Sequence, residues 1–212
     1  MKILLIFNPN AGAGRAARLK DRVTAALGAF AQVDVHCTRG AGDATACVAA
    51  QELARFDAVV AAGGDGTLFE VLNGIYSHRA DRRIPLGLVP VGTGNAFARD
   101  LGLMPGDWEK GIEIIRGGKT RQEHFGRVNC GADGADRETF HFLNIIGTGL
   151  PVVAMKTSEK LKFLGRSAYS IATLWHALKR RSHPLELSLD GKRLALESMF
   201  VEVSNTRYTG TS

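Results

Sequence analysis

Two patterns of apolar and polar residues divide the chain into a first part that alternates strands with helices and a second part rich in strands. In the first part, short apolar runs predict buried strands, and apolar residues three and four positions apart predict helices. The predicted strands cover residues 2–7, 33–37, 58–62 and 86–89, and the predicted helices cover residues 15–29, 43–54, 68–76, 95–101 and 108–116. This alternation indicates an α/β fold, a Rossmann-like parallel sheet with helices on both faces.

The pattern changes after Gly117 and Gly118. Strand composition marks residues 124–130, 139–146, 185–189, 193–196 and 199–203, and hairpin turn signals stand at Asp133-Gly134 and Asp190-Gly191. We therefore expect an α/β domain over residues 1–118 and a largely antiparallel β-sandwich domain over residues 119–212. One helix near residues 158–181 is predicted to interrupt the second domain, because apolar residues recur there at spacings of three and four.

Composition describes an ordinary soluble globular protein of 212 residues, with 45% hydrophobic and 23% charged residues. No apolar run approaches the roughly 18 residues that span a bilayer, and the N-terminus enters a strand pattern without a signal-peptide layout. We therefore expect a cytoplasmic location. Cys37, Cys47 and Cys130 are widely spaced among small or apolar neighbours, which argues against a disulfide framework or a zinc site.

The net charge of +6 is concentrated in one segment. Residues 156–181 hold seven basic residues and one acidic residue, an excess equal to that of the whole chain. Phe163 and Leu174 fall on one helical face beside these cations, which is typical of transient contact with a membrane surface. Packing within the protein is the alternative interpretation. Nucleic acid is not an expected partner, because the segment lacks interleaved aromatic residues.

The most informative local motif is Gly63-Gly64-Asp65-Gly66-Thr67, which follows an apolar strand and precedes a helical pattern. Glycines let the backbone come close to a ligand, and the free N–H groups at a helix start favour an anion. A single carboxylate in such a place can face a metal ion carried by phosphates, or a hydroxyl about to lose its proton. The motif predicts a site for phosphoryl transfer.

Two further loops have the same position after a strand. Pro90-Val91-Gly92-Thr93-Gly94-Asn95 opens one helix, and Asn8-Pro9-Asn10-Ala11-Gly12 precedes another. Gly12 also begins a GxGxxA pattern, but the four residues after the strand widen the turn that a dinucleotide fingerprint needs to be tight. Because the carboxyl ends of parallel strands meet at one edge of a sheet, the three loops predict a single nucleotide crevice.

Together these three motifs, with Glu70 and Asn73-Gly74, resemble the diacylglycerol kinase catalytic domain family, which includes soluble bacterial lipid kinases and sphingosine kinases. The resemblance continues more loosely through 144–149, 160–169 and 203–205. It implies ATP-dependent phosphorylation of a lipid hydroxyl, with Mg²⁺ and with the nucleotide between an α/β domain and a β-sandwich domain. The lipid itself and the oligomeric state are not assigned.

The resemblance also implies site residues. Asp65 is the candidate catalytic carboxylate, acting through a metal ion or by orienting the acceptor hydroxyl, and the metal ligands are not assigned. The residues implied for the ATP site are Asn8, Pro9, Asn10, Ala11, Gly12, Thr38, Gly63, Gly64, Asp65, Gly66, Thr67, Glu70, Gly92, Thr93, Gly94 and Asn95.

Two departures from the family pattern affect this expectation. Phe69 stands where the family often has a polar residue that contacts the nucleotide. Residues 205–210 look like the beginning of a glycine-rich segment that in the family leads to more strands and a later acidic-glycine motif holding the base, whereas the sequence ends at Ser212. We therefore expect the second domain to be incomplete, and catalysis by this chain to be incomplete with it.

Two alternative functions stay open. One is a phosphotransferase related to NAD kinase or phosphofructokinase, since these enzymes also use a glycine-flanked Asp on a similar domain. The other is a truncated, non-catalytic module that binds nucleotide and membrane. The sequence favours the lipid kinase, peripheral at the membrane, because no second polar cluster suits a dinucleotide or a sugar phosphate.

Overall fold

The computed structural model describes residues 1–77, 84–131, 138–149, 157, 175 and 182–208. The chain divides into two compact units. Unit 1 comprises Met1–Asn144 and Asn205–Ser212, and unit 2 comprises Ile145–Ser204. The domain boundary expected near residues 117–120 stays a prediction.

Unit 1 is built on a four-stranded parallel sheet, as the apolar pattern predicts. Its strands are β1 (Lys2–Phe7), β2 (Gln32–Cys37), β3 (Ala58–Gly63) and β4 (Leu86–Pro90), in the spatial order β2-β1-β3-β4. β1 pairs in register with β2 and β3, and β3 pairs with β4. The predicted α/β fold class is therefore confirmed.

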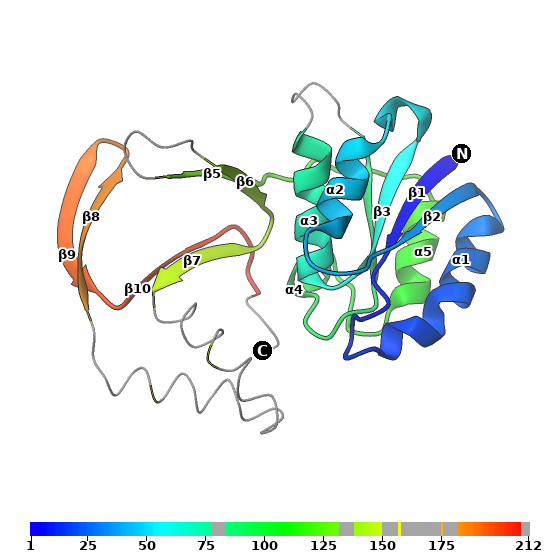
Figure 1. The fold of residues 1–212 in the computed structure, drawn as a ribbon, viewed down its shortest axis with the longest axis horizontal. Coiled ribbons are helices and arrows are strands. Elements are labelled where there is room, and N and C mark those ends of the chain that lie inside the picture. Colours follow the sequence, from blue (N-terminus) through cyan, green and yellow to red (C-terminus); the bar gives the residue numbers. More distant parts are fainter. Residues whose placement is uncertain (78–83, 132–137, 150–156, 158–174, 176–181, 209–212) are drawn as a thin grey trace. The chain divides into compact units, whose positions relative to one another are not determined.

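Side chains of alternate strand residues supply two apolar layers, one on each face of the sheet. Ile3, Leu5 and Phe7 pack into one layer, and Leu4 and Ile6 into the other. The first layer lies under α1 (Lys20–Gly28) and α5 (Trp108–Arg116), and the second under α2 (Asp43–Ala50), α3 (Asp65–Ser77) and α4 (Ala96–Asp100). Figure 1 shows these two groups of helices on opposite sides of the strands.

Some helix ends differ from the predicted ones. α3 begins at Asp65 instead of residue 68, because the Leu68 N–H donates to the Gly64 carbonyl at 3.1 Å and closes the first turn around the acidic residue. α2 ends at Ala50, where Gln51 is extended, and a short 3₁₀ turn follows at Leu53–Arg55. The predicted helix 15–29 is a 3₁₀ turn at Arg15–Leu19 followed by α1.

A β-hairpin in unit 1 is attached to α3 by one asparagine. The hairpin consists of β5 (Gly126–Cys130) and β6 (Glu138–Phe142), which pair antiparallel. The Asn73 side chain donates to the His141 carbonyl at 2.9 Å and accepts the His141 N–H at 2.8 Å, as a neighbouring strand would. The rings of Tyr76, Phe125 and His141 pack together beside this pair, with centroids 4.7 to 5.4 Å apart.

Unit 2 contains two antiparallel strand pairs among its described residues. One joins β7 (Ile145–Gly149) to β10 (Phe200–Ser204), and the other joins β8 (His183–Leu189) to β9 (Lys192–Ser198). Asp190 and Gly191 both have positive φ, as the hairpin signal predicts. The predicted strand 139–146 is two strands, β6 and β7, interrupted at residues 143 and 144.

Two sequence expectations lie outside the described residues, namely the turn at Asp133-Gly134 and the basic helix near 158–181. Within the part of the chain that the structure describes, no helix is both long and apolar enough to cross a bilayer.

The ring cluster at α3 predicts a pH dependence of stability. Burial, reinforced by the charge of Arg127, lowers the pKa of His141 below its ordinary value of 6.5. The unfolded chain therefore binds a proton at a pH where folded His141 is still neutral, so the free energy of unfolding falls as the pH drops from 7 through 6.5 towards the folded pKa.

We expect His141→Phe to keep the ring packing and to reduce this acid-dependent loss of stability. Urea unfolding at pH 7 and pH 5 measures it, with His124→Phe, at an exposed position, as the matched control. An equal loss of stability in the wild type and in His141→Phe would contradict the assignment.

Candidate functional site

The loops that follow all four strands of the parallel sheet meet around one cavity of about 420 Å³. Asn8 follows β1, Thr38 follows β2, Gly64 follows β3 and Gly92 follows β4 closely. This is the edge at which open α/β sheets bind ligands, because the strand ends and helix starts leave backbone groups free there. The structure thus brings the three predicted glycine loops together and adds a fourth loop.

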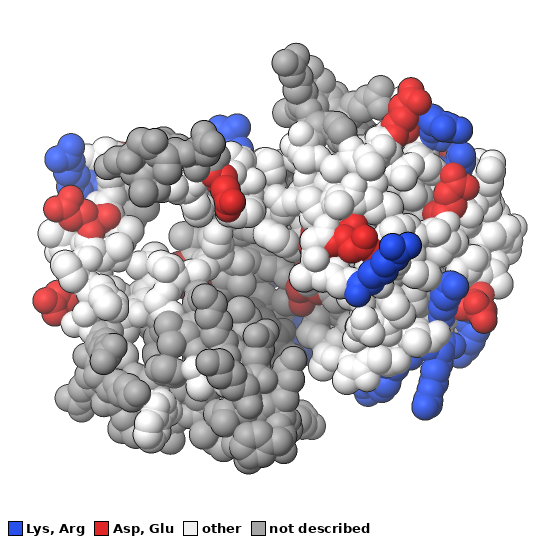
Figure 2. Space-filling model, in the orientation of Figure 1, with Lys and Arg blue, Asp and Glu red and all other residues white. Residues whose placement is uncertain are grey.

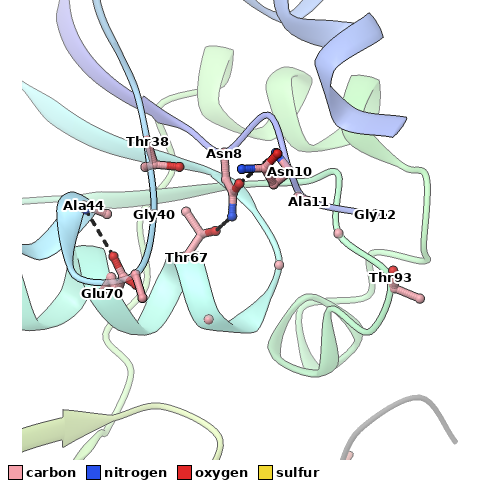
Figure 3. Close-up of a pocket in the computed structure, with 14 residues that line it drawn as sticks. Asn8, Asn10, Ala11, Gly12, Thr38, Gly40, Ala44, Thr67, Glu70 and Thr93 are labelled. Carbon is pink, nitrogen blue, oxygen red and sulfur yellow. Dashed lines mark hydrogen bonds between the residues drawn. The ribbon is translucent and has the colours of Figure 1, made fainter. Parts of the chain in front are cut away.

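Most of the predicted site residues line this cavity. Those in the lining are Asn8, Asn10, Ala11, Gly12, Thr38, Gly64, Gly66, Thr67, Glu70, Gly92 and Thr93. The other predicted residues, Pro9, Gly63, Asp65, Gly94 and Asn95, belong to the same loops but not to the lining. For the residues of both groups a nucleotide contact stays a prediction. Figure 3 shows Asn8 and Thr67 facing each other across the loops, with Thr38 and Glu70 on one side and Thr93 on the other.

The first loop and α3 are joined by a hydrogen bond inside the site. Asn8 Nδ2 donates to Thr67 Oγ1 at 3.0 Å, and Asn8 Oδ1 accepts the Asn10 N–H at 2.9 Å. Thr67 is buried against Gly63, where even a single added Cβ would overlap the Thr67 side chain. A glycine is therefore required at position 63 for Thr67 to pack against the end of β3. Thr67 lines the cavity, whereas Gly63 does not.

Asp65 holds the start of α4. Its Oδ2 accepts the Ala96 N–H at 3.0 Å, and its Oδ1 accepts the Phe97 N–H at 3.2 Å. These are N–H groups of the first turn of α4, which have no acceptor within the helix. The carboxylate therefore joins the turn after β3 to the helix after β4.

Asn144 makes the third contact to this carboxylate. Asn144 Nδ2 donates to Asp65 Oδ1 at 2.7 Å. The Asn144 carbonyl in turn accepts the Asn205 N–H at 2.7 Å, and Asn205 Nδ2 donates to the His124 and Leu143 carbonyls at 2.7 and 2.9 Å. A carboxylate has about four acceptor positions. Three donors among the described residues leave one position, on Oδ2.

The glycine turns after β3 and β4 lie in direct backbone contact. The N–H groups of Val91 and Gly92 both donate to the Gly63 carbonyl, at 3.1 and 3.0 Å. A Cβ on Gly92 would lie 2.5 Å from Gly64 Cα. Asn95 stabilises the turn after β4, because its Nδ2 donates to the Gly92 carbonyl at 2.8 Å. Asn95 is 2% exposed and has positive φ.

The fourth loop was missed by sequence reasoning apart from Thr38. Gly40, Ala41 and Ala44 also line the cavity. The sequence signal that could have identified this loop is a glycine-containing segment directly after the second predicted strand. The other three loops follow their strands in the same way. Phe69, the departure from the family pattern, is 41% exposed on α3 and does not belong to the lining.

Hydrogen bonds to the Asp43 carboxylate order this fourth loop. Asp43 Oδ2 lies 2.9 Å from His36 Nε2 and accepts the Arg39 N–H at 2.9 Å. The hydrogen bond with His36, followed by the one from Arg39, lowers the pKa of Asp43 below its ordinary value. Because these hydrogen bonds stabilise the anion, Asp43 stays ionised to a lower pH in the folded chain than in the unfolded chain.

The site suits a phosphate-bearing ligand better than a metal bound by protein alone. Its volume lies within the range of small-molecule pockets. Gly66 and Thr67 line the cavity and belong to the first turn of α3, where N–H groups have no acceptor within the helix. No group of three or more His, Cys, Asp or Glu residues in the described segments could hold a metal ion. A magnesium ion bound through ligand phosphates and one carboxylate remains compatible with these residues.

Comparison with known proteins agrees with the motifs. Residues 2–128 match the diacylglycerol kinase catalytic domain family. A diacylglycerol kinase of Bacillus subtilis is 34% identical over 97% of this chain, and one of Staphylococcus carnosus is 31% identical over 89%. The chain spans 65% and 58% of the lengths of these relatives.

Solved structures give the same result. The crystal structure of a diacylglycerol kinase from Bacillus anthracis has a TM-score of 0.67 and 31% identity, covering 98% of this chain and 65% of that one. A second structure, of a putative diacylglycerol kinase from the same organism, has a TM-score of 0.71 and 31% identity, covering 99% of this chain and 68% of that one.

The backbone contact between the two turns predicts that two glycine substitutions differ in their effect on stability. Gly92→Ala places a methyl group against Gly64, so we expect the free energy of unfolding to fall by about 1–3 kcal/mol. Gly66→Ala is the matched control, because among the described residues no atom lies within 4 Å of its added Cβ. Since Gly66 lies in the first turn of α3, this variant should be neutral or more stable by up to about 1 kcal/mol. Urea unfolding measures both, and equal stabilities would contradict the tight contact.

Proposed function

Because the chain belongs to the diacylglycerol kinase catalytic domain family, we propose that it is an ATP-dependent lipid kinase. It transfers the γ-phosphate to the hydroxyl of a diacylglycerol- or sphingosine-like lipid. The observation that carries the proposal is the cavity at the carboxyl ends of the sheet, where three glycine loops meet and one of them, the turn after β3, also contains Asp65. Phosphoryl transfer needs positioning and charge neutralisation more than covalent chemistry, and such a site offers both.

The residues have separate tasks in this proposal. The glycine turns at 12 and 92 admit the phosphates close to the backbone, and the N-terminal N–H groups of α3 attract their charge. Thr38 and the loop after β2 receive the remainder of the nucleotide. Mg²⁺, when bound, would neutralise the phosphate charge, and Asp65 is the carboxylate to which we assign the reaction.

Asp65 is suited to hold the acceptor group in one orientation. Three donors fix its carboxylate from α4 and Asn144, so its position does not depend on the ligand. The acceptor position that remains on Oδ2 can take the hydroxyl proton of the lipid or face the metal ion. In either role the carboxylate acts through charge and geometry.

The proposal predicts that Asp65→Asn lowers phosphate transfer by about 10²–10⁴, the usual contribution of a positioned acid or base. Labelled ATP with diacylglycerol and sphingosine in mixed micelles measures the rate. Asp21→Asn, an exposed acidic residue of α1, is the matched control and should retain activity. Urea unfolding of Asp65→Asn separates a lost fold from lost chemistry, because the variant also gives up an acceptor for α4.

The acceptor panel discriminates the alternative functions. Transfer to NAD or to a sugar phosphate instead of lipid would favour the soluble-substrate phosphotransferases. ATP binding without transfer to any acceptor would favour a nucleotide-binding module. Transfer to lipid at an unchanged rate in Asp65→Asn would refute the role of that carboxylate.

We also propose that the chain meets its lipid at the membrane surface. Acidic and basic side chains both occur on the face of unit 1 drawn in Figure 2, so the described surface there carries charges of both signs. The basic excess lies in residues 156–181, almost all of them outside the described residues. A cationic segment of this kind favours anionic lipid by about 1 kcal/mol per basic residue near the surface.

Vesicle sedimentation checks this membrane contact. We expect the chain to sediment with vesicles that contain phosphatidylserine, less with neutral vesicles, and progressively less as salt increases, because salt screens exposed charges. Equal sedimentation with both kinds of vesicle, or none with either, would contradict an electrostatic contact.

A further inference from the structure

The wall of the cavity formed by residues 38–44 is shaped by backbone more than by side chains. It contributes Thr38, Gly40, Ala41 and Ala44 to the lining. Of these, only Thr38 has a polar side chain, and it is 7% exposed. The width of the cavity on this side therefore depends on where the backbone of this wall is held.

Glu70 holds that backbone from the neighbouring helix. Its Oε1 accepts the Gly42 N–H at 3.0 Å, and its Oε2 accepts the Ala44 N–H at 3.1 Å. The Glu70 carbonyl also accepts Thr45 Oγ1 at 3.0 Å. Figure 3 shows the Glu70 side chain directed at the start of α2, with the bond to Ala44 marked. Both carboxylate oxygens are thus engaged with the wall.

This arrangement fixes the wall relative to the first turn of α3. Glu70 lies on α3, the helix whose first turn contains Asp65, Gly66 and Thr67. α2 and α3 pack very closely, since a Cβ on Gly74 would lie 2.7 Å from Val48 Cβ. The Glu70 carboxylate also occupies the N–H groups at the N-terminus of α2 and adds a negative charge there. A second anionic group is therefore disfavoured at the N-terminus of α2.

We infer that Glu70 is a positioning residue. It sets nucleotide affinity by holding the backbone of residues 38–44, not by contacting the reacting phosphates. The expected changes in KM and kcat rest on the proposed kinase function. The resemblance to the family implies only that Glu70 belongs to the nucleotide site.

Glu70→Gln tests the inference in the full chain. The amide keeps the shape of the side chain but places a donor against one of the two N–H groups. Hydrogen bonds to a charged group are strong, so we expect the KM and the Kd for ATP to rise on the order of tenfold to a hundredfold. The kcat should stay within about threefold. Glu109→Gln, on the exposed face of α5 with 66% side-chain exposure, is the matched control and should match the wild type.

A pair of variants at Gly42 tests the same backbone without touching Glu70. Gly42 has φ +82°, is not part of the cavity lining, and has no described atom within 4 Å of an added Cβ. Gly42→Val strains this left-handed conformation, whereas Asn tolerates it. We expect Gly42→Val to raise the ATP KM as Glu70→Gln does, and Gly42→Asn to stay near the wild type.

Amide hydrogen exchange gives a readout that does not require ATP. In the nucleotide-free chain, Glu70→Gln should speed exchange at residues 42 and 44, with circular dichroism confirming that the variant is folded. Unchanged exchange, or a fall in kcat at constant KM, would overturn the inference, as would a normal KM in Gly42→Val. Failure of the wild type to bind ATP would refute the proposed function instead, while faster exchange in the variant would still support the positioning role.

Discussion

The site depends on one constraint, the parallel pairing of all four strands in the sheet of unit 1. Parallel strands must end at the same edge, so the four segments that follow them are brought to one place whatever their sequences. The two central strands, β1 and β3, are buried on both faces and fix the order. Residues from all four of these segments therefore line a single cavity.

Much of this could be predicted, because the deciding signals are local. The runs at residues 2–7 and 58–62 are apolar on both faces, which only a strand covered on both sides requires, and both are strands. The glycine turns could be assigned to the site because parallel topology alone brings strand ends together. The α/β fold class and the grouping of the predicted loops around one cavity followed from these two facts.

The details that could not be predicted are contacts between distant residues. Asp65 bonds to Asn144 and to α4, partners far along the chain, and no pattern near Asp65 indicates them. The same holds for Glu70, whose two acceptor oxygens serve α2. The sequence predicts a loop where α3 has its first turn, because glycine-rich segments disfavour helix. Tertiary hydrogen bonds of Asp65 and Thr67 stabilise this turn instead.

The hydrogen bond between Asn144 and Asn205 bears on how such a chain could have been assembled. Unit 1 ends at the first of these residues and resumes at the second, and the Asn205 N–H lies 2.7 Å from the Asn144 carbonyl. Unit 2 is therefore topologically an insertion whose two ends meet. A short turn could replace it without moving either end, and domain exchange is tolerated at such junctions. Unit 1 could thus have acquired unit 2, and could exchange it, without any change to its parallel sheet.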